Sequence, residues 1–409
     1  MRRFGLLLAA AVLVPAVPAA AQFTVFESGH ARLGLTGYVR AFTGVHDLGY
    51  DPPASASNPR TTGFHGEVVR LKWQAEREGW RLDVHNRVQA QVTSGGGDGP
   101  VLGIGVTTVP DRLVDLETVI VDEPGVRVWH DLDRLSVTAY TALADITVGR
   151  QAITWGVSSL FPVADLWAQF SPFELDTEEK PGIDAVRALF YPTEGLEMDA
   201  VLADRGALDD LSVGLRATYA LAGADVWAGG GKFWREALTM GGVTVLFDET
   251  RLRAEFVVPY DLDADRWDNP RITLGTDWIR GTLTLTGEYH FNGIGAAGTS
   301  GYVDRLGDPR FVRGETYYVG RHYLGGLASW SPDQENRVTL AANALANLQD
   351  ASIALTPVFG YDLGQSSRVS VGALLSWGET PRFDRLPPTL GSEFGTYGDL
   401  LFTRVSVYF

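Results

Sequence analysis

Charged side chains recur at every second position in several runs of this sequence. Between Trp80 and Val92, Arg81, Asp83, His85 and Arg87 alternate with apolar residues. Alternate residues of a β-strand point to the same face. A row of both signs would be too costly in a dry core, so this face is expected to meet water. The chemistry that such a face supports is selection of a solute by its charge.

Other alternating runs extend this charged face. The alternative for each residue is that it solvates the face and pairs with a neighbour, which is the favoured interpretation for most of them individually. The candidate pore-lining residues are Arg70, Lys72, Arg81, Asp83, His85, Arg87, Arg216, Arg251, Arg253, Glu255, Asp277 and Glu288.

Residues 152–182 form the most informative connection, because aromatic residues and an acidic cluster share one long segment. Two interpretations stay open: a constriction loop that folds inward, and an external loop packed on its own aromatic residues. The candidate constriction residues are Arg150, Trp155, Trp167, Asp176, Glu178, Glu179 and Lys180.

Motifs for other chemistry are weak. The sequence has no Gly-x-Ser-x-Gly elbow and no His-Glu-x-x-His motif, so we expect no enzyme. The glycines of 293–298 match a dinucleotide fingerprint, but no βαβ unit surrounds them. The acidic residues of 261–268 lack the glycine and terminal Glu of a calcium loop, so a solvated loop is favoured. We therefore predict no cofactor and no metal, and the net charge of −16 argues against nucleic-acid binding.

The ends of the chain indicate export. Arg2 and Arg3 precede an apolar run that closes with Ala19-Ala20-Ala21, which predicts a signal peptide over 1–21, cleaved near Ala21. The remainder, 22–409, is expected to be a single domain. It contains no cysteine, so its stability must come from a large core or a closed sheet.

Short alternating runs separated by turn residues predict about 18 strands, with a range of 16–18. Their connections sort by parity, because every connection longer than four residues falls on one side. The connections on that side are 45–64, 93–131, 152–182, 204–210, 235–236, 259–270, 292–316, 348–350 and 380–397. Long external loops and short periplasmic turns are typical of transmembrane antiparallel up-and-down β-barrels.

The charged faces require that such a barrel has its polar side within. Lipid cannot hydrogen-bond the backbone, so a spanning sheet must close on itself. The final strand, Asp399 to Phe409, alternates in the same way and is expected to close against the strand near 30–44. About 18 strands enclose a space too wide for side chains to fill.

One stretch carries a resemblance. Its segments resemble a group of poorly characterised Gram-negative outer-membrane porin-like proteins, which share a Gly-Arg-Gln…Trp-Gly hairpin, a loop rich in Pro and Asp, and an Asp-Ala strand. These segments are Asp131-Leu-Asp-Arg-Leu135, Asp145-Ile-Thr-Val-Gly-Arg-Gln-Ala-Ile-Thr-Trp-Gly156, Leu160-Phe-Pro-Val-Ala-Asp-Leu166 and Lys180-Pro-Gly-Ile-Asp-Ala-Val-Arg187. The resemblance covers about 60 residues. It implies a transport role but supplies no solute.

The expected protein is a porin-type channel in the bacterial outer membrane that passes small hydrophilic solutes passively. The alternative is a surface-exposed barrel with a plugged lumen that acts as a binding, adhesin or structural protein. The partners expected are outer-membrane lipid, the barrel-assembly machinery and an unidentified small solute, with a homo-oligomer left open.

Overall fold

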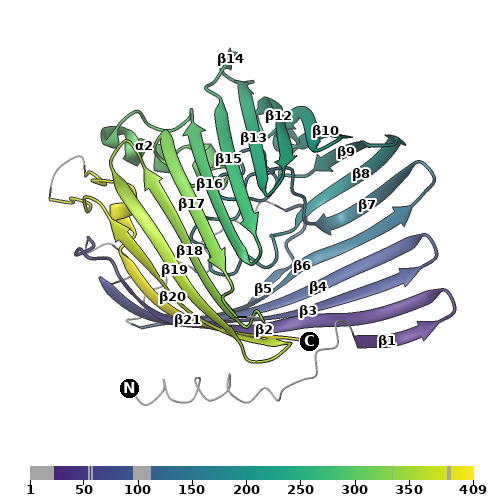
Figure 1. Ribbon diagram of the computed structural model, residues 1–409, viewed down its shortest axis with the longest axis horizontal. Coiled ribbons are helices and arrows are strands. Elements are labelled where there is room, and N and C mark those ends of the chain that lie inside the picture. Colours follow the sequence, from purple (N-terminus) through teal and green to yellow (C-terminus); the bar gives the residue numbers. More distant parts are fainter. Residues whose placement is uncertain (1–22, 54–55, 57–58, 95–111, 334, 385–387) are drawn as a thin grey trace.

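The computed structural model describes residues 23–409 except 54–55, 57–58, 95–111, 334 and 385–387. The chain forms a closed β-barrel of 18 antiparallel strands, which Figure 1 shows as one continuous wall. Among the described residues, no helix has the length and apolar character needed to cross a membrane. The predicted fold class is therefore confirmed.

The strands follow one another around the wall in chain order. They are β2 (Ala31–Asp47), β3 (Thr61–Arg77), β4 (Trp80–Thr93), β6 (Val126–Tyr140), β7 (Ala144–Gln151), β8 (Ile183–Thr193), β9 (Leu196–Ala203), β10 (Ser212–Leu221), β11 (Ala224–Phe233), β12 (Glu236–Phe247), β13 (Thr250–Asp261), β15 (Arg271–Arg280), β16 (Leu283–Asn292), β17 (His322–Trp330), β18 (Val338–Asn347), β19 (Ser352–Asp362), β20 (Ser367–Trp377) and β21 (Asp399–Tyr408).

The barrel closes between its first and last wall strands. β21 pairs with β2 from Tyr38↔Tyr408 to Asp47↔Asp399. On its other edge, β21 pairs with β20. The closure predicted for the final strand is confirmed, and it removes the sheet edges that lipid could not satisfy.

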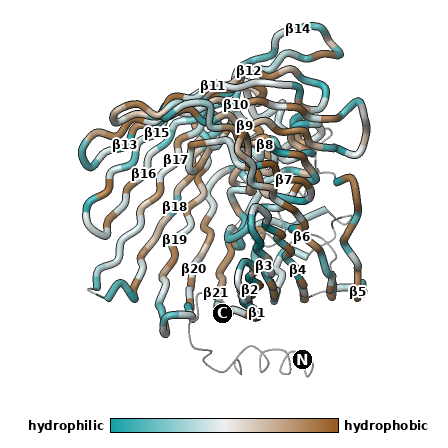
Figure 2. The backbone as a smooth tube through the Cα atoms, turned by 90° about the vertical axis from the view of Figure 1, so that its right-hand side faces the viewer, coloured by the Kyte–Doolittle hydropathy of each residue, from teal (hydrophilic) through white to brown (hydrophobic). Residues whose placement is uncertain are grey.

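Alternation along the strands separates an apolar exterior from a polar interior. In β13, Leu252 and Phe256 are exposed, whereas Arg253 and Glu255 between them are buried. Figure 2 shows apolar and polar stretches alternating along the wall. The exposed apolar residues form the lipid-facing surface expected of a membrane barrel.

Shorter elements lie outside the 18-strand wall. β1 (Phe23–Ser28) pairs with the start of β2, and β5 (Glu117–Glu123) pairs with the outer half of β6. The external connections also contain β14 (Arg266–Trp267), α2 (Tyr302–Leu306), α3 (Pro309–Val312), η1 (Leu208–Asp210), η2 (Thr299–Gly301) and η3 (Phe394–Thr396). Neither β1 nor β5 was predicted from the sequence.

The connections agree with the predicted parity. The long ones, such as 152–182, 293–321 and 378–398, share one end of the barrel, while tight turns such as 78–79 and 248–249 share the other. Two strand boundaries differ from the prediction by five residues or more. Residues 317–321, predicted as strand, form an ordered loop before β17, and β6 begins at Val126 because β4 continues to pair with it there.

Candidate functional site

Loop 152–182 folds inward and attaches to the inner wall. Consecutive amides at Ser159, Leu160 and Phe161 donate hydrogen bonds of 2.7–3.0 Å to the carboxylate of Glu288 on β16. The amide of Val157 donates to Glu255 on β13 at 2.7 Å. Wall carboxylates therefore fix the loop backbone inside the barrel, which supports the inward-folded interpretation.

Aromatic residues hold the first half of this loop. Trp155 and Trp167 meet edge to face with centroids 5.0 Å apart, and both contact Phe233 of β11. The indole of Trp155 donates to Asp199 of β9 at 2.7 Å. Both tryptophans have 0% exposure, so they position the loop and do not line a path for solute.

Several predicted pore-lining residues are buried beneath the loop. Arg253 donates to Asp277 at 2.8 Å and to Glu288 at 2.9 Å. Arg251 also binds Asp277, at 2.7 Å. Arg216 donates to the carbonyl oxygen of Trp155 at 2.8 Å. On this side of the barrel, the charges support the loop.

The opposite wall carries the remaining predicted charges. Lys72, His85 and Arg134 form one row across β3, β4 and β6. Arg81 pairs with Asp83 at 2.7 Å, and both are partly accessible. The predicted residues of β3 and β4 therefore share one inner face.

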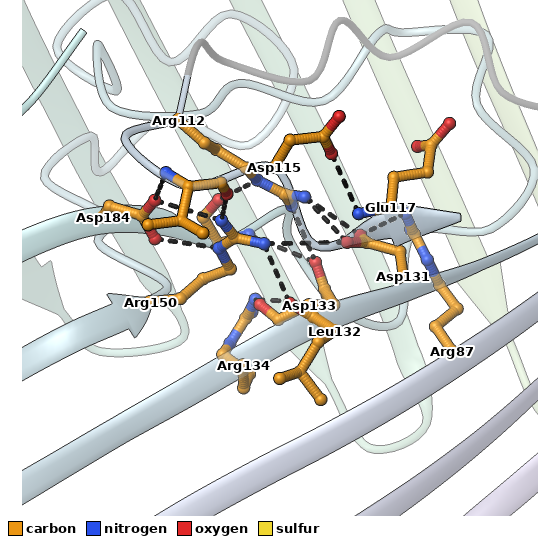
Figure 3. A network of polar contacts seen from close by, with 12 residues as sticks. Arg87, Arg112, Asp115, Glu117, Asp131, Leu132, Asp133, Arg134, Arg150 and Asp184 are labelled. Carbon is orange, nitrogen blue, oxygen red and sulfur yellow. Dashed lines mark hydrogen bonds and ion pairs between the residues drawn. The ribbon is translucent and has the colours of Figure 1, made fainter. Parts of the chain in front are cut away.

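A buried network joins this wall to the loops, as Figure 3 shows. Asp131 accepts from Arg87 at 3.1 Å and from Arg112 at 2.9 Å. Arg150, one of the predicted constriction residues, donates to Asp184 at 2.8 Å. The guanidinium of Arg150 is thus part of the wall network beside the loop.

The centre of the network is Asp133, which has no exposed surface. It contacts Arg70 at 2.5 Å, Arg134 at 3.2 Å and Arg112 at 3.4 Å. The run Asp131-Leu-Asp-Arg134 was not among the predicted site residues. Its alternating carboxylates on a strand were the signal that could have identified it.

Glycines with restricted geometry explain part of the sequence motif. Gly149 has a φ of 115°, and a Cβ there would lie 2.2 Å from the carbonyl oxygen of Leu135. A Cβ at Gly182 would lie 2.3 Å from the carbonyl oxygen of Asp133. Only glycine permits these close approaches of the β7 end and the loop to β6.

The second half of the loop contains an acidic segment, residues 174–179. Asp176 contacts Arg40 of β2, and Glu178 binds the same guanidinium at 2.9 Å. Glu179 accepts from Lys72 at 2.8 Å. Three predicted constriction residues thus lie against basic residues of the wall, and Arg40 was not predicted.

Two loop carboxyl groups have pKa values that their surroundings shift. Burial raises the pKa of the Asp165 carboxyl, although the contact with Lys180 opposes this. For Glu179, burial also acts to raise the pKa, but the hydrogen bond and charge of Lys72 outweigh it and lower the pKa. Ionised Glu179 therefore favours the docked segment.

Cavities lie on both sides of the acidic segment. One of about 190 Å³ lies toward β2–β6, between the segment and a wall that includes Arg70, Arg87 and Trp129. The other, of about 180 Å³, lies toward β18–β21 and is lined largely by apolar groups such as Leu374 and Phe402. The segment therefore separates a charged compartment from a more apolar one.

A further cavity of about 650 Å³ lies among the external loops. Its lining carries both signs of charge, including Arg235, Asp263 and Arg310. Arg310 is paired with Glu236 and Asp268, and Arg235 with Asp263. This cavity resembles an outer vestibule more than a site with unsatisfied charge.

Among the described residues, no group of three or more His, Cys, Asp or Glu side chains is arranged to hold a metal ion.

Comparisons with known proteins identify the architecture. No protein-family model matches the sequence, and no curated protein matches it. OccAB2 of Acinetobacter baumannii has a similar structure, with a TM-score of 0.57, 10% identity, and coverage of 92% of this chain and 98% of that one. A BenF-like porin from Pseudomonas fluorescens Pf-5 has a TM-score of 0.55 and 10% identity, with coverage of 92% of this chain and 98% of that one. The outer membrane protein opdK from Pseudomonas aeruginosa has a TM-score of 0.54 and 9% identity, with coverage of 92% of this chain and 98% of that one. The chain has the fold of the outer-membrane porins.

Proposed function

We propose that this protein is an outer-membrane channel through which small hydrophilic solutes diffuse passively. The observation that carries the proposal is the pair of cavities flanking the acidic segment inside a closed, lipid-facing barrel. A barrel of this width can contain an aqueous path, and opposed charges at its narrowest part select solutes. The porin named among the similar structures supports the same function.

Within this proposal, the solute meets the charged compartment. Arg70, Arg87, Asp176 and Glu179 line it, and all four were candidate site residues. The buried charges on β13 and β16 have a structural role, because they hold the loop that narrows the channel. The proposal also includes export through a signal peptide over 1–21 and insertion by the barrel-assembly machinery.

A second candidate function is a surface barrel whose lumen is closed. The aromatic half of the loop favours it, because Trp155, Phe161 and Trp167 are fully buried and fill one side of the lumen. In that case the external loops would bind a partner and no solute would pass.

Conductance in a planar bilayer separates the two functions. Purified, folded protein is expected to give discrete openings, and the conductance of each opening is expected to rise with salt concentration because the path is aqueous. Folding is checked first by gel migration, since a closed barrel is expected to migrate differently before and after boiling. Folded protein that never conducts would support the closed barrel and contradict the channel.

A further inference from the structure

We propose that the acidic segment, residues 174–179, is a gate that opens when anions from solution replace it on the basic wall. This inference rests on the proposed channel function. The segment would act as a tethered anionic ligand of its own channel. Ion pairs hold it to the wall, whereas aromatic packing and backbone hydrogen bonds to Glu255 and Glu288 hold the first half of the loop.

The segment is suspended between two fixed points. Before it, Phe173 is buried and packs on Tyr397, with ring centroids 4.4 Å apart. After it, Lys180 contacts Asp165 and donates to Thr154 at 3.0 Å. Between these points Thr177 and Glu178 are exposed, so water and ions reach the middle of the segment.

Charge complementarity holds the segment to the wall. Arg40 is 2% exposed and is held by Asp176 and Glu178. Lys72 holds Glu179 at 2.8 Å, and Arg134 lies 4.0 Å from the same carboxylate. Asp176, Glu178 and Glu179 therefore each pair with a wall cation.

Release of the segment alone would be unfavourable. Arg40 would keep hydrogen bonds to Ser406 and Tyr408 but would lose both carboxylates. Removing the partners of a buried charge is strongly destabilising because the charge stays out of water without compensation. An anion bound at Arg40 and Lys72 removes this cost, so opening is expected to be an exchange.

The structure also provides space for the movement. The cavity toward β18–β21 adjoins Leu175 and Thr177 on the side of the segment away from Lys72. Arg404 donates to the carbonyl oxygen of Leu175 at 3.2 Å, a single contact that a shift of the backbone can break. Movement into this cavity would widen the charged compartment.

Single-channel recording tests the exchange with inorganic phosphate as the probe. At a constant ionic strength of about 0.1 M, replacing chloride with phosphate is expected to raise the open probability of the wild type. The triple variant Asp176→Asn, Glu178→Gln, Glu179→Gln is expected to be open at least about tenfold more often without phosphate, because the docked segment no longer supplies the counter-charges of the buried Arg40. Phosphate should then have no further effect.

Asp263→Asn is the matched control, because it removes an exposed external carboxylate that pairs with Arg235. It is expected to leave both the open probability and the phosphate response unchanged. A wild type whose open probability ignores phosphate would overturn the gate, as would a triple variant that behaves like the wild type.

A second measurement reports the position of the segment without requiring conductance. The chain contains no cysteine, so Thr177→Cys gives one labelling site. Its reaction rate with a charged thiol reagent is expected to change with phosphate in detergent-solubilised protein and to be insensitive in the triple-variant background. If the protein conducts but phosphate changes neither the labelling rate nor the open probability, the gate is rejected and the channel function is retained. Phosphate-dependent labelling without conductance would retain the segment's movement and reject the channel.

Discussion

At the scale of single residues, the interior depends on carboxylates that each serve several cations. Asp133 contacts three arginines although it has no exposed surface. Its ionised form compensates guanidinium groups that come from β3, β6 and the connection before β5. The side chain therefore stabilises the wall and one external connection together.

Asp133→Asn is expected to destabilise the barrel by about 3–5 kcal/mol, because buried arginines lose their counter-charge. Urea unfolding in detergent micelles measures the change. Asp263→Asn is the control, because an exposed pair contributes about 1 kcal/mol or less. Equal effects of the two substitutions would show that burial does not determine the contribution of Asp133.

Glu393 is a buried carboxyl group that joins external loops. It accepts hydrogen bonds from Tyr323 at 2.5 Å, Asn347 at 2.7 Å and the amide of Val319 at 3.1 Å. Burial raises its pKa to about 7, although these hydrogen bonds oppose the shift. Between the ordinary pKa of a glutamate and a pH of about 7, the folded state therefore holds a proton that the unfolded chain releases.

The sign of the pH effect follows from this raised pKa. Stability from Glu393 is fully present below the ordinary pKa of a glutamate and is lost as the pH rises through about 7. The wild type is therefore expected to unfold at a higher temperature at about pH 5.5 than at about pH 8. Glu393→Gln should reduce this difference. An unchanged pH profile in the variant would assign the effect to other groups.

At the scale of elements, the β6–β7 hairpin determines where the loop enters the lumen. β7 ends with Arg150 and Gln151, directly before loop 152–182. Gln151 donates to the carbonyl oxygen of Ala185 at 3.2 Å, and Arg150 to Asp184. Both side chains bind β8, so the start and the end of the loop are held at the same place.

Gly149→Ala tests this hairpin. The new methyl group would collide with the backbone of β6, so we expect a loss of about 2 kcal/mol or more in unfolding free energy. Gly29→Ala is the matched control, because Gly29 also has a positive φ, 53°, but nothing within 4 Å of the added Cβ. It should cost about 1–2 kcal/mol, the strain of a Cβ in the left-handed region. A similar loss for both would attribute the effect to backbone conformation alone.

At the scale of the whole molecule, closure depends on the last residues of the chain. The amide of Gly37 donates to the carbonyl oxygen of Phe409 at 2.8 Å, and the amide of Phe409 donates back to Gly37 at 3.0 Å. The Phe409 ring also lies against Gly37. The terminal residue therefore completes the β2–β21 pairing at its inner end.

Deletion of Phe409 is expected to reduce the folded fraction in the membrane while leaving the conductance of the remaining channels unchanged. The reason is that it removes two closing hydrogen bonds but no lumen group. Heat-dependent gel migration of membrane fractions measures the folded fraction. Phe359→Ala, which removes an exposed aromatic of β19, is the control. Normal insertion of the truncated chain would contradict this role.

The sequence predicted the architecture better than the site, for a physical reason. Alternation and turn residues act locally, so β16 and its polar face at Glu288 and His290 could be predicted from neighbouring residues. Side-chain pairing depends on register and on loops far along the chain. Arg40 and Asp176 are 136 positions apart, and no local pattern relates them. β5 was missed because its register depends on an extension of β6 beyond β7.

The small strand β1 has a consequence for the alignment of the closed wall. It pairs with β2 starting at Phe23↔Leu35, while Phe409 reaches the same edge of β2 at Gly37. Only Thr36 separates the two ends along β2. β1 therefore acts as a mechanical stop for the terminal strand: sliding toward the N-terminus of β2 would drive Phe409 into space that Phe23 already occupies. β1, the first strand after the predicted signal peptide, thus limits how far β21 can extend along β2.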